Sequence, residues 1–194
     1  MKKDIIGKVE FSPIYGVIGM IKKIQKKCSD YQVKTLSVTD CGELFELYQT
    51  NPDYFEIVEA RPPKLEDCLN DLTECPPSFP KEKKFYVGFY QNGKLQAVVD
   101  YLMGYPEEEI FYIGLFMLEG KNRAKGYGRK LLTDVLDVAI DTGFTRLRLG
   151  VVSKNKNAMH FWIKNGLKEI RQVTRKRDNG TEAEIIVMEK DLVR

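Results

Sequence analysis

The sequence predicts an α+β fold in which helices flank one central mixed sheet, mostly antiparallel but with one parallel strand pair. The first observation is the order of apolar patterns: strand, helices, three strands, helix, strand, helix, two strands. The second is a pair of hairpin turns, at Asn92-Gly93 and in "RDNG" near the end. The third is a strand, glycine-rich loop, helix and strand in succession over residues 110–152, a βαβ unit that requires a parallel pair.

Length and composition are those of an ordinary globular protein. The 194 residues suit one domain with a sizeable core, and 43% are hydrophobic against 30% charged. The net charge of +3 gives no reason to expect nucleic acid as a partner, because basic and acidic residues are interleaved. The cysteines lack the spacing of a zinc knuckle or a redox dithiol, so we expect free thiols, no metal and a reducing, cytoplasmic location. They are Cys28, Cys41, Cys68 and Cys75.

Residues 1–30 form an N-terminal extension ahead of the domain that we place at residues 31–194. The opening "MKKDII" and "PIYGVIGMI" resembles a secretory signal, but Asp4 and Glu10 break the charge pattern and no small-residue cleavage site follows. No stretch has the length of a membrane span. A basic amphipathic helix of this kind can lie on a membrane or cover a core, and we expect it to cover the core. Its apolar stripe is Ile14, Val17, Ile18, Ile21 and Ile24.

Residues 31–84 begin with a regular strand and helix and then become irregular. "YQVKTLSV" alternates as a strand, and Asp40 with Glu43 predicts a capping box that starts a helix. Most of the prolines follow, in "RPPK" and "CPPSFP". One helix is expected between them, with the apolar face Leu65, Cys68, Leu69 and Leu72. Such a segment is typical of a loop that faces a substrate, and the alternative is a simple connector.

The rest of the chain is more regular. "FYVGFYQNGKLQAVVDYLM" reads as two strands around the Asn92-Gly93 turn, and residues 110–118, "IFYIGLFML", as a central strand buried on both faces. A helix ended by Gly143, the strand "TRLRLGVV" at 145–152, a short helix at 157–165 ended by Gly166, and a closing hairpin complete the order. The first of these helices has the stripe Leu131, Leu132, Val135, Leu136 and Ala139.

The stretch "NRAKGYGRKLL", residues 122–132, places two glycines and several cations in front of that helix. Glycines let a ligand approach the backbone closely, and the free N–H groups of a helix N-terminus attract phosphate. A dinucleotide-binding fold does not fit, because its glycine fingerprint follows the first strand. A Walker loop does not fit either, because no Gly-Lys-Ser/Thr closes the stretch.

Two motifs together resemble the GNAT superfamily of acetyl-CoA-dependent N-acetyltransferases. "RAKGYG" is similar to its Arg/Gln-x-x-Gly-x-Gly/Ala pyrophosphate loop, and "NKNAMHFWIKNGL", residues 155–167, is similar to its second signature. They occur in the family's order, and the likeness covers residues 31–194. The stretches "VVDYLMGYP", "IGLFML" and "FW" resemble a bacterial branch of the superfamily.

The resemblance implies that the strands at 110–118 and 145–152 splay apart and hold acetyl-CoA between them. The pantetheine arm would bind the backbone of Phe116, Met117 and Leu118. The pyrophosphate would lie on the N–H groups from Ala124 to Arg129, helped by the helix dipole and by cationic side chains. The implied loop contacts are Arg123, Ala124, Lys125, Gly126, Tyr127, Gly128 and Arg129. The implied contacts in the second signature are Asn155, Ala158 and Trp162. Alternatively, Asn155 is an ordinary turn or cap residue, and Ala158 and Trp162 pack in the core.

The implied reaction is direct attack of a neutral amine on the thioester in a ternary complex. The family's usual tyrosine acid is replaced by Trp162, whose indole N–H is not a useful proton donor. Tyr112 is a possible substitute, but we expect the thiolate to leave unassisted. A base must take the amine proton, and each candidate is alternatively a solvated surface group. The candidates are Glu119, Asp100, Glu109 and His160.

An enzyme that acetylates a small-molecule or protein amine is therefore favoured over two other classes. An acyl-CoA-binding module with little or no turnover would explain the loss of the tyrosine. A structural protein acting through its basic N-terminal helix would leave the glycine loop unexplained. The acceptor pocket is expected at residues 51–84 and 104–109, and the chain is expected to be a monomer or homodimer.

Overall fold

A computed structural model describes residues 13–193 of the chain, with side chains from residue 19 onward. The expectations about "MKKDII" and about the side chains of Ile14, Val17 and Ile18 lie outside the described residues. Among the described helices, none combines the length and apolar character needed to span a membrane.

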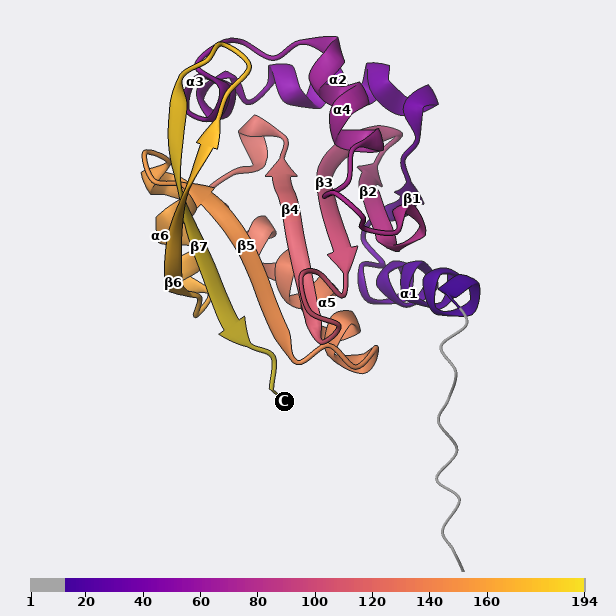
Figure 1. The fold of residues 1–194 in the computed structure, drawn as a ribbon. Helices are drawn as coiled ribbons and strands as arrows, with labels where there is room; N and C mark the ends of the chain where they lie inside the picture. The colour runs from indigo at the N-terminus through magenta and orange to yellow at the C-terminus, as the bar shows by residue number, and fades with distance from the viewer. Residues whose placement is uncertain (1–12, 194) are drawn as a thin grey trace, which may run out of the picture.

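One seven-stranded sheet runs through the molecule in the order β1-β2-β3-β4-β5-β7-β6 (Figure 1). The β4–β5 pair is parallel, and the other pairs between described strands are antiparallel. This is the mixed sheet that the sequence predicts. The strands are β1 (Gln32–Thr35), β2 (Lys84–Gln91), β3 (Lys94–Met103), β4 (Ile110–Leu118), β5 (Arg146–Val152), β6 (Lys168–Lys176) and β7 (Glu182–Asp191).

Helices cover both faces of this sheet. On one face α1, α5 and α6 pack over the larger hydrophobic cluster, which includes Met20, Leu132 and Trp162. On the other face α2 and α4 pack over a second cluster, which includes Leu44 and Cys68. The helices are α1 (Pro13–Lys27), α2 (Cys41–Gln49), α3 (Pro52–Glu59), α4 (Leu65–Thr73), α5 (Tyr127–Asp141) and α6 (Lys156–Lys164).

Most of the predicted elements are confirmed. Asn92 and Gly93 both have positive φ, 51° and 71°, as a two-residue type I′ hairpin turn requires. Strand β4 has the predicted bounds, and all five residues of the predicted α5 stripe are buried. Gly143 and Gly166 follow α5 and α6 with φ of 103° and 89°, the left-handed conformation of a helix terminator.

The region between β1 and β2 differs from the prediction. The predicted Asp40–Glu43 box is wrong, because Asp40 turns back to accept a hydrogen bond from the Ser37 N–H at 2.8 Å. Glu43 instead accepts one from the hydroxyl of Tyr90 at 2.6 Å, across the α2–β2 contact. The irregular segment also contains α3, which the sequence does not predict.

The predicted face of α4 is only partly correct. Cys68 is buried, but Leu65 and Leu69 are 49% and 41% exposed. Leu72 is half-buried and packs against the same cluster as Cys68. Helix α4 therefore contacts α2 and the sheet through a narrower face than its four apolar residues predict.

Helix α1 belongs to the core of the described fold. Met20 and Ile24 are 1% and 0% exposed, and both lie in the cluster that α5 and the sheet form. Cys28, just past the helix, is buried there as well. The described part of the helix covers the core, as expected. Its buried face includes Met20, which the predicted stripe lacks, while Ile21 of that stripe is only half-buried.

Replacing Ile24 by alanine should therefore lower the free energy of unfolding by about 2–5 kcal/mol, the usual cost of a buried aliphatic truncation. Lys26→Ala, on the exposed side of the same helix, should change it by less than about 0.5 kcal/mol. Urea denaturation of the two variants gives the comparison. Equal small effects would mean that α1 is not part of the cooperative core.

Candidate active site

A β-bulge at Gly114 interrupts the central strand. Asp100 of β3 lies opposite Leu115 and Tyr101 lies opposite Ile113, so Gly114 is an extra residue in β4. A Cβ atom at this position would stand 2.5 Å from Asp100 Oδ2, so any larger residue would displace that carboxylate. The bulge also exchanges the two faces of the strand: Ile113 packs in the α1–α5 cluster, and Leu115 packs in the α2–α4 cluster.

Strands β4 and β5 separate at the bulge. Their parallel pairing joins Ile110–Ile113 to Arg146–Leu149 and goes no further. Figure 1 shows the two strands diverging toward their carboxyl ends. Among the described strands, β4 beyond Gly114 pairs only with β3, and β5 beyond Leu149 pairs only with β7. The facing edges therefore carry backbone N–H and C=O groups that an extended ligand can bind as a strand would.

The glycine loop lies where this opening ends, at the start of α5. Ala124 and Gly126 have positive φ, 58° and 86°, and Gly126 is the residue that precedes the helix. The first helical N–H to reach a carbonyl is that of Lys130, which donates to Gly126 at 3.2 Å. The N–H groups of Tyr127, Gly128 and Arg129 come before it and are the ones that a helix N-terminus offers to an anion.

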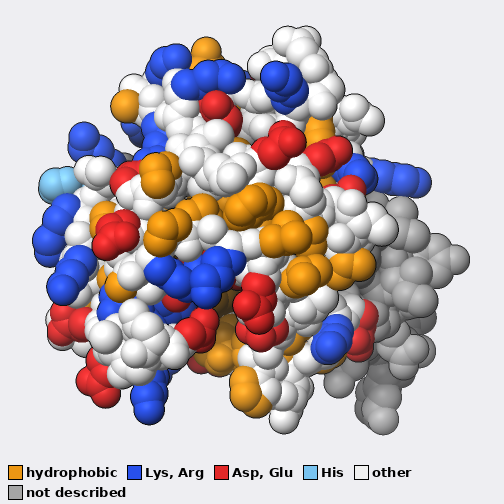
Figure 2. Space-filling model, turned by 90° about the horizontal axis from the view of Figure 1, so that it is seen from above, with side chains coloured by type: hydrophobic (Ala, Val, Ile, Leu, Met, Phe, Trp, Pro, Cys, Tyr) orange, Lys and Arg blue, Asp and Glu red, His pale blue; other side chains and the backbone are white. Residues whose placement is uncertain are grey.

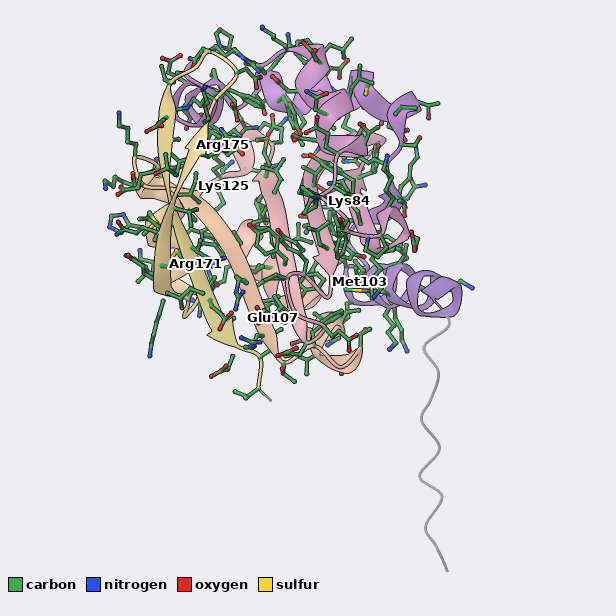
Figure 3. The ribbon with its side chains drawn as sticks, in the orientation of Figure 1. Lys84, Met103, Glu107, Lys125, Arg171 and Arg175 are labelled. Atoms are coloured by element: carbon green, nitrogen blue, oxygen red, sulfur yellow. The ribbon has the colours of Figure 1, made fainter. Side chains whose placement is uncertain are left out.

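The two glycines at the start of α5 have different surroundings. A Cβ on Gly126 would meet no atom within 4 Å, so its backbone is open on that side. A Cβ on Gly128 would contact the side chain of Leu118 at 3.4 Å, an ordinary packing distance, so α5 begins close to the end of β4. Lys125 and Arg129 are exposed, and Lys125 lies near the carboxyl ends of β4 and β5 (Figure 3). The loop thus combines open backbone N–H groups with cationic side chains.

Arg123 is directed to α3. Its guanidinium donates to the side chains of Asn51 and Asp53, the latter at 2.7 Å, and this hydrogen bond lowers the pKa of Asp53. At the other end of α3, the guanidinium of Arg175 donates to the carbonyl of Val58 at 3.0 Å, and Arg175 lies beside the helix in Figure 3. Helix α3 is therefore held between the glycine loop and the β6–β7 hairpin.

The second signature forms α6 and the loop before it. Asn155 is buried, and its Oδ1 caps the helix by accepting from the N–H of Ala158 at 3.1 Å. Trp162 is buried against Phe116 of β4, with 6.0 Å between ring centroids. The cap and packing roles are thus present at these positions. His160 is exposed.

Two of the predicted acids are engaged away from the bulge. Glu119 follows β4 and caps a short turn by accepting from the N–H of Lys121 at 3.1 Å. Glu109 precedes β4 and pairs with Arg146 at 2.5 Å, and its pKa is lowered by a backbone hydrogen bond and by this arginine. Glu109 thus lies at the end of β4 opposite to the opening.

Asp100 lies at the bulge itself. It is buried, with Oδ1 2.7 Å from Lys84 Nζ and Oδ2 beside Gly114. Burial raises the pKa of this carboxyl, and Lys84 opposes the shift. The alternative reading of Asp100 as a solvated surface acid is therefore wrong. Lys84 lies over β2 and β3 in Figure 3, and its ammonium is 5.8 Å from the ring centre of Tyr86.

Tyr112 lies on the same face of the sheet as Asp100. Its hydroxyl would be 3.6 Å from a Cβ atom on Gly150, so the side chain reaches from β4 to β5 where the strands begin to diverge. Its ring meets that of Tyr105 edge to face at 5.3 Å. Burial raises the pKa of Tyr112, which therefore stays protonated at neutral pH.

Sequence reasoning missed a buried polar chain under α4. The hydroxyl of Tyr48 donates to the carboxylate of Asp71 and lies 2.7 Å from the hydroxyl of Tyr86. Burial raises the pKa of Asp71 to about 7. The three residues come from α4, α2 and β2, and only the tertiary fold brings them together. The local signal was limited to two tyrosines at apolar positions of their elements.

The surface at the upper end of the molecule in Figure 1 carries both hydrophobic and charged side chains. Seen from above, hydrophobic side chains form a central band with acidic and basic groups on both sides (Figure 2). A ligand that approaches from this end meets apolar surface with charges at its margins.

Comparison with known proteins agrees with this geometry. Residues 43–167 match the family model described as the acetyltransferase (GNAT) family. No curated protein matches the chain in sequence. Among solved structures, an acetyltransferase from Thermus thermophilus is similar with a TM-score of 0.66 and 22% identity, over 84% of this chain and 97% of that one.

Two further solved structures share the fold. The ribosomal-protein-S18-alanine N-acetyltransferase from Escherichia coli has a TM-score of 0.59 and 18% identity, over 84% of this chain and 95% of its own. The PaiA N-acetyltransferase from Thermoplasma acidophilum, in complex with coenzyme A, has a TM-score of 0.57 and 17% identity, over 83% and 98%.

Removing Lys84 should leave the Asp100 carboxylate buried without its partner. Lys84→Met should therefore cost about 3–5 kcal/mol of unfolding free energy near neutral pH. Without the lysine, Asp100 binds a proton more tightly in the folded than in the unfolded chain, so stability should fall as the pH rises above about 4. Urea denaturation should show a larger deficit at about pH 8 than at about pH 5.

The matched control is the double variant Lys84→Met/Asp100→Leu, which has no buried charge at this position. It should recover most of the loss and show no such pH dependence. A deficit in Lys84→Met that is the same at both pH values would contradict the account of the pair.

Proposed function

The chain belongs to the acetyltransferase (GNAT) family, and we propose that it transfers the acetyl group of acetyl-CoA to a primary amine of a small molecule or protein. The observation that carries the proposal is the continuity of two features: the unpaired edge between β4 and β5, and the α5 N-terminus at its end. An extended amide-containing arm fits the first, and a pyrophosphate fits the second.

The residues present fit this co-substrate. Phe116, Met117 and Leu118 lie on the part of β4 that has left β5, so their free backbone groups would hold the pantetheine arm. The N–H groups of the loop from Ala124 through Arg129, with about half a unit of positive charge from the helix dipole, would hold the pyrophosphate. Lys125 and Arg129 would add charge, while Arg123 fixes α3 beside them. When bound, acetyl-CoA supplies an activated acyl group and a thiolate leaving group.

Among the predicted acids, Asp100 is the best supported as the group that meets the acceptor. Its Oδ2 lies at the bulge where the strands part, and Lys84 fixes the other oxygen. A buried carboxylate there would attract and orient the ammonium form of the amine. Tyr112 reaches toward Gly150 on the same face and offers a hydroxyl there. Trp162 acts as a packing wall, and the thiolate leaves unassisted.

The acceptor would enter over the α2–α4 end of the sheet. The segments at residues 51–84 and 104–109 border this face: α3 and α4 lie in the first, and Tyr105 packs beside Tyr112 from the second. The cysteines are free, as expected, and free thiols are typical of a reducing compartment. We therefore propose a cytoplasmic location. A monomer or homodimer remains the expectation for its oligomeric state.

The direct test is turnover of acetyl-CoA with a panel of primary amines, with the products identified by mass spectrometry. The proposal expects an acetylated amine, with a mass increase that appears only when both substrates are present. Binding of acetyl-CoA without any acetylated product would contradict it and would favour an acyl-CoA-binding module.

The glycine loop can be tested by binding alone. Gly126→Glu places a negative charge where the pyrophosphate should lie, so acetyl-CoA affinity measured by calorimetry should fall at least about a hundredfold. Gly126→Ala imposes the same backbone strain at φ 86° without the charge and should lose much less. Unchanged affinity in folded Gly126→Glu would remove the cofactor assignment.

The role of Trp162 can be tested by turnover. If the indole only packs, Trp162→Phe should keep kcat within about tenfold of the wild type, because loss of a general acid would cost about a hundredfold or more. Tyr112→Phe should behave similarly if the thiolate leaves unassisted. A loss of several hundredfold in either variant, with acetyl-CoA affinity intact, would assign it the proton donor.

A further inference from the structure

The buried chain formed by Tyr86, Tyr48 and Asp71 crosses from the sheet to α4. Tyr48 and Tyr86 are 0% and 3% exposed, and their hydroxyl oxygens are 2.7 Å apart. Asp71 accepts from Tyr48 and keeps some contact with solvent. The chain therefore leads from a buried position on the sheet to a carboxyl group at the surface of the α4 layer.

While Asp71 is ionised, the hydrogen bonds of this chain have one direction. An ionised carboxylate only accepts, so the Tyr48 hydrogen points to Asp71. The oxygen of Tyr48 must then accept from Tyr86, whose own oxygen has a lone pair left for another donor. Burial raises the pKa of both tyrosines, so both keep their protons at neutral pH. The sheet end of the chain can accept a hydrogen bond from an ammonium group.

The sheet end of the chain lies one strand away from the bulge. Tyr86 is directly opposite Asp100 in the β2–β3 register, and Asp100 Oδ2 lies beside Gly114. Side chains at opposite positions on one face have Cβ atoms about 5 Å apart. An ammonium group held by Asp100 would therefore lie on the face of the sheet from which the Tyr86 side chain projects, beside Lys84, whose own ammonium is 5.8 Å from the ring centre of Tyr86.

We propose that Tyr86, Tyr48 and Asp71 form a proton relay that removes the proton which the acceptor amine must lose before it attacks. The inference rests on the proposed function. Tyr86 accepts a proton from the ammonium while its own passes to Tyr48, and the proton of Tyr48 passes to Asp71. The ammonium becomes a neutral amine and the carboxylate becomes a carboxylic acid. The new N–C bond then forms as the C–S bond breaks, and coenzyme A leaves as the thiolate. The nitrogen loses its second proton to solvent, and Asp71 also returns its proton to solvent.

The surroundings of Asp71 suit a reversible proton acceptor. The titratable groups that face it are Tyr48 on α2, Tyr54 on α3, Asp67 and Cys68 on α4, Lys84 and Tyr86 on β2, and Asp100 on β3. Burial is the largest influence and raises its pKa to about 7, so the group can take up and release a proton near neutral pH. Lys84, which would oppose this, is paired with Asp100.

The test is the pH dependence of kcat with an amine that the wild type acetylates. The ionised carboxylate is the active form, so kcat should fall as the pH drops below about 7 and level off above it. Asp71→Asn should lower kcat about a hundredfold at neutral pH and abolish this limb. Tyr48→Phe leaves the carboxylate in place but breaks the relay, and should lower kcat to a similar extent with the KM for acetyl-CoA unchanged.

Glu66→Gln is the matched control, since this acid is exposed on the same helix and should leave both kcat and its pH profile unchanged. If the chain serves only to hold α4, the variants should lose stability in urea denaturation but keep the acidic limb. Retention of that limb, with kcat within about threefold in either folded variant, overturns the relay. Absence of any acetylated amine with the wild type is the separate result that overturns the proposed function itself.

Discussion

The extra residue at Gly114 shifts the register of β4 against β3 next to the Asp100 carboxylate, and the geometry of the site follows from this bulge. Before it, β4 is an ordinary parallel neighbour of β5; after it, none of the strands within residues 13–193 pairs with this edge of β4. The same bulge turns Leu115 toward α2 and α4, so the two layers of the protein meet at the opening. A backbone irregularity, rather than a special side chain, thus creates the open edge.

Helix α3, beside the opening, is fixed by an arginine at each of its ends. Helix α3 is held at its start by Arg123 from the glycine loop and at its end by Arg175 from the hairpin. Val58 of α3 also packs with Val152 and Ala183, beyond the point where β5 leaves β4. The residues proposed to hold the co-substrate and those proposed to meet the acceptor therefore belong to one connected framework, with the buried Lys84–Asp100 pair at its centre.

The sequence predicted the order of elements, the parallel pair and the glycine loop because each has a local cause: periodicity, turn residues or a helix start. It did not predict α3, which is short and lies in a proline-rich stretch, or the binding partners of Asp40 and Glu43, which tertiary contacts decide. The bulge could not be predicted because β4 has apolar residues at both odd and even positions. An exchange of the two faces of the strand therefore leaves its hydrophobic pattern unchanged. The Asp71 chain was hidden because its members lie on three elements far apart in the sequence.

The central claim is that the open edge of β4 and the start of α5 bind one acyl-CoA molecule. Backbone amide hydrogen exchange, measured residue by residue with and without acetyl-CoA, tests it directly. The account predicts slower exchange in two separate places, on β4 after Gly114 and at the N–H groups of Tyr127, Gly128 and Arg129. Protection elsewhere, with both of these segments unchanged at saturating acetyl-CoA, would contradict it.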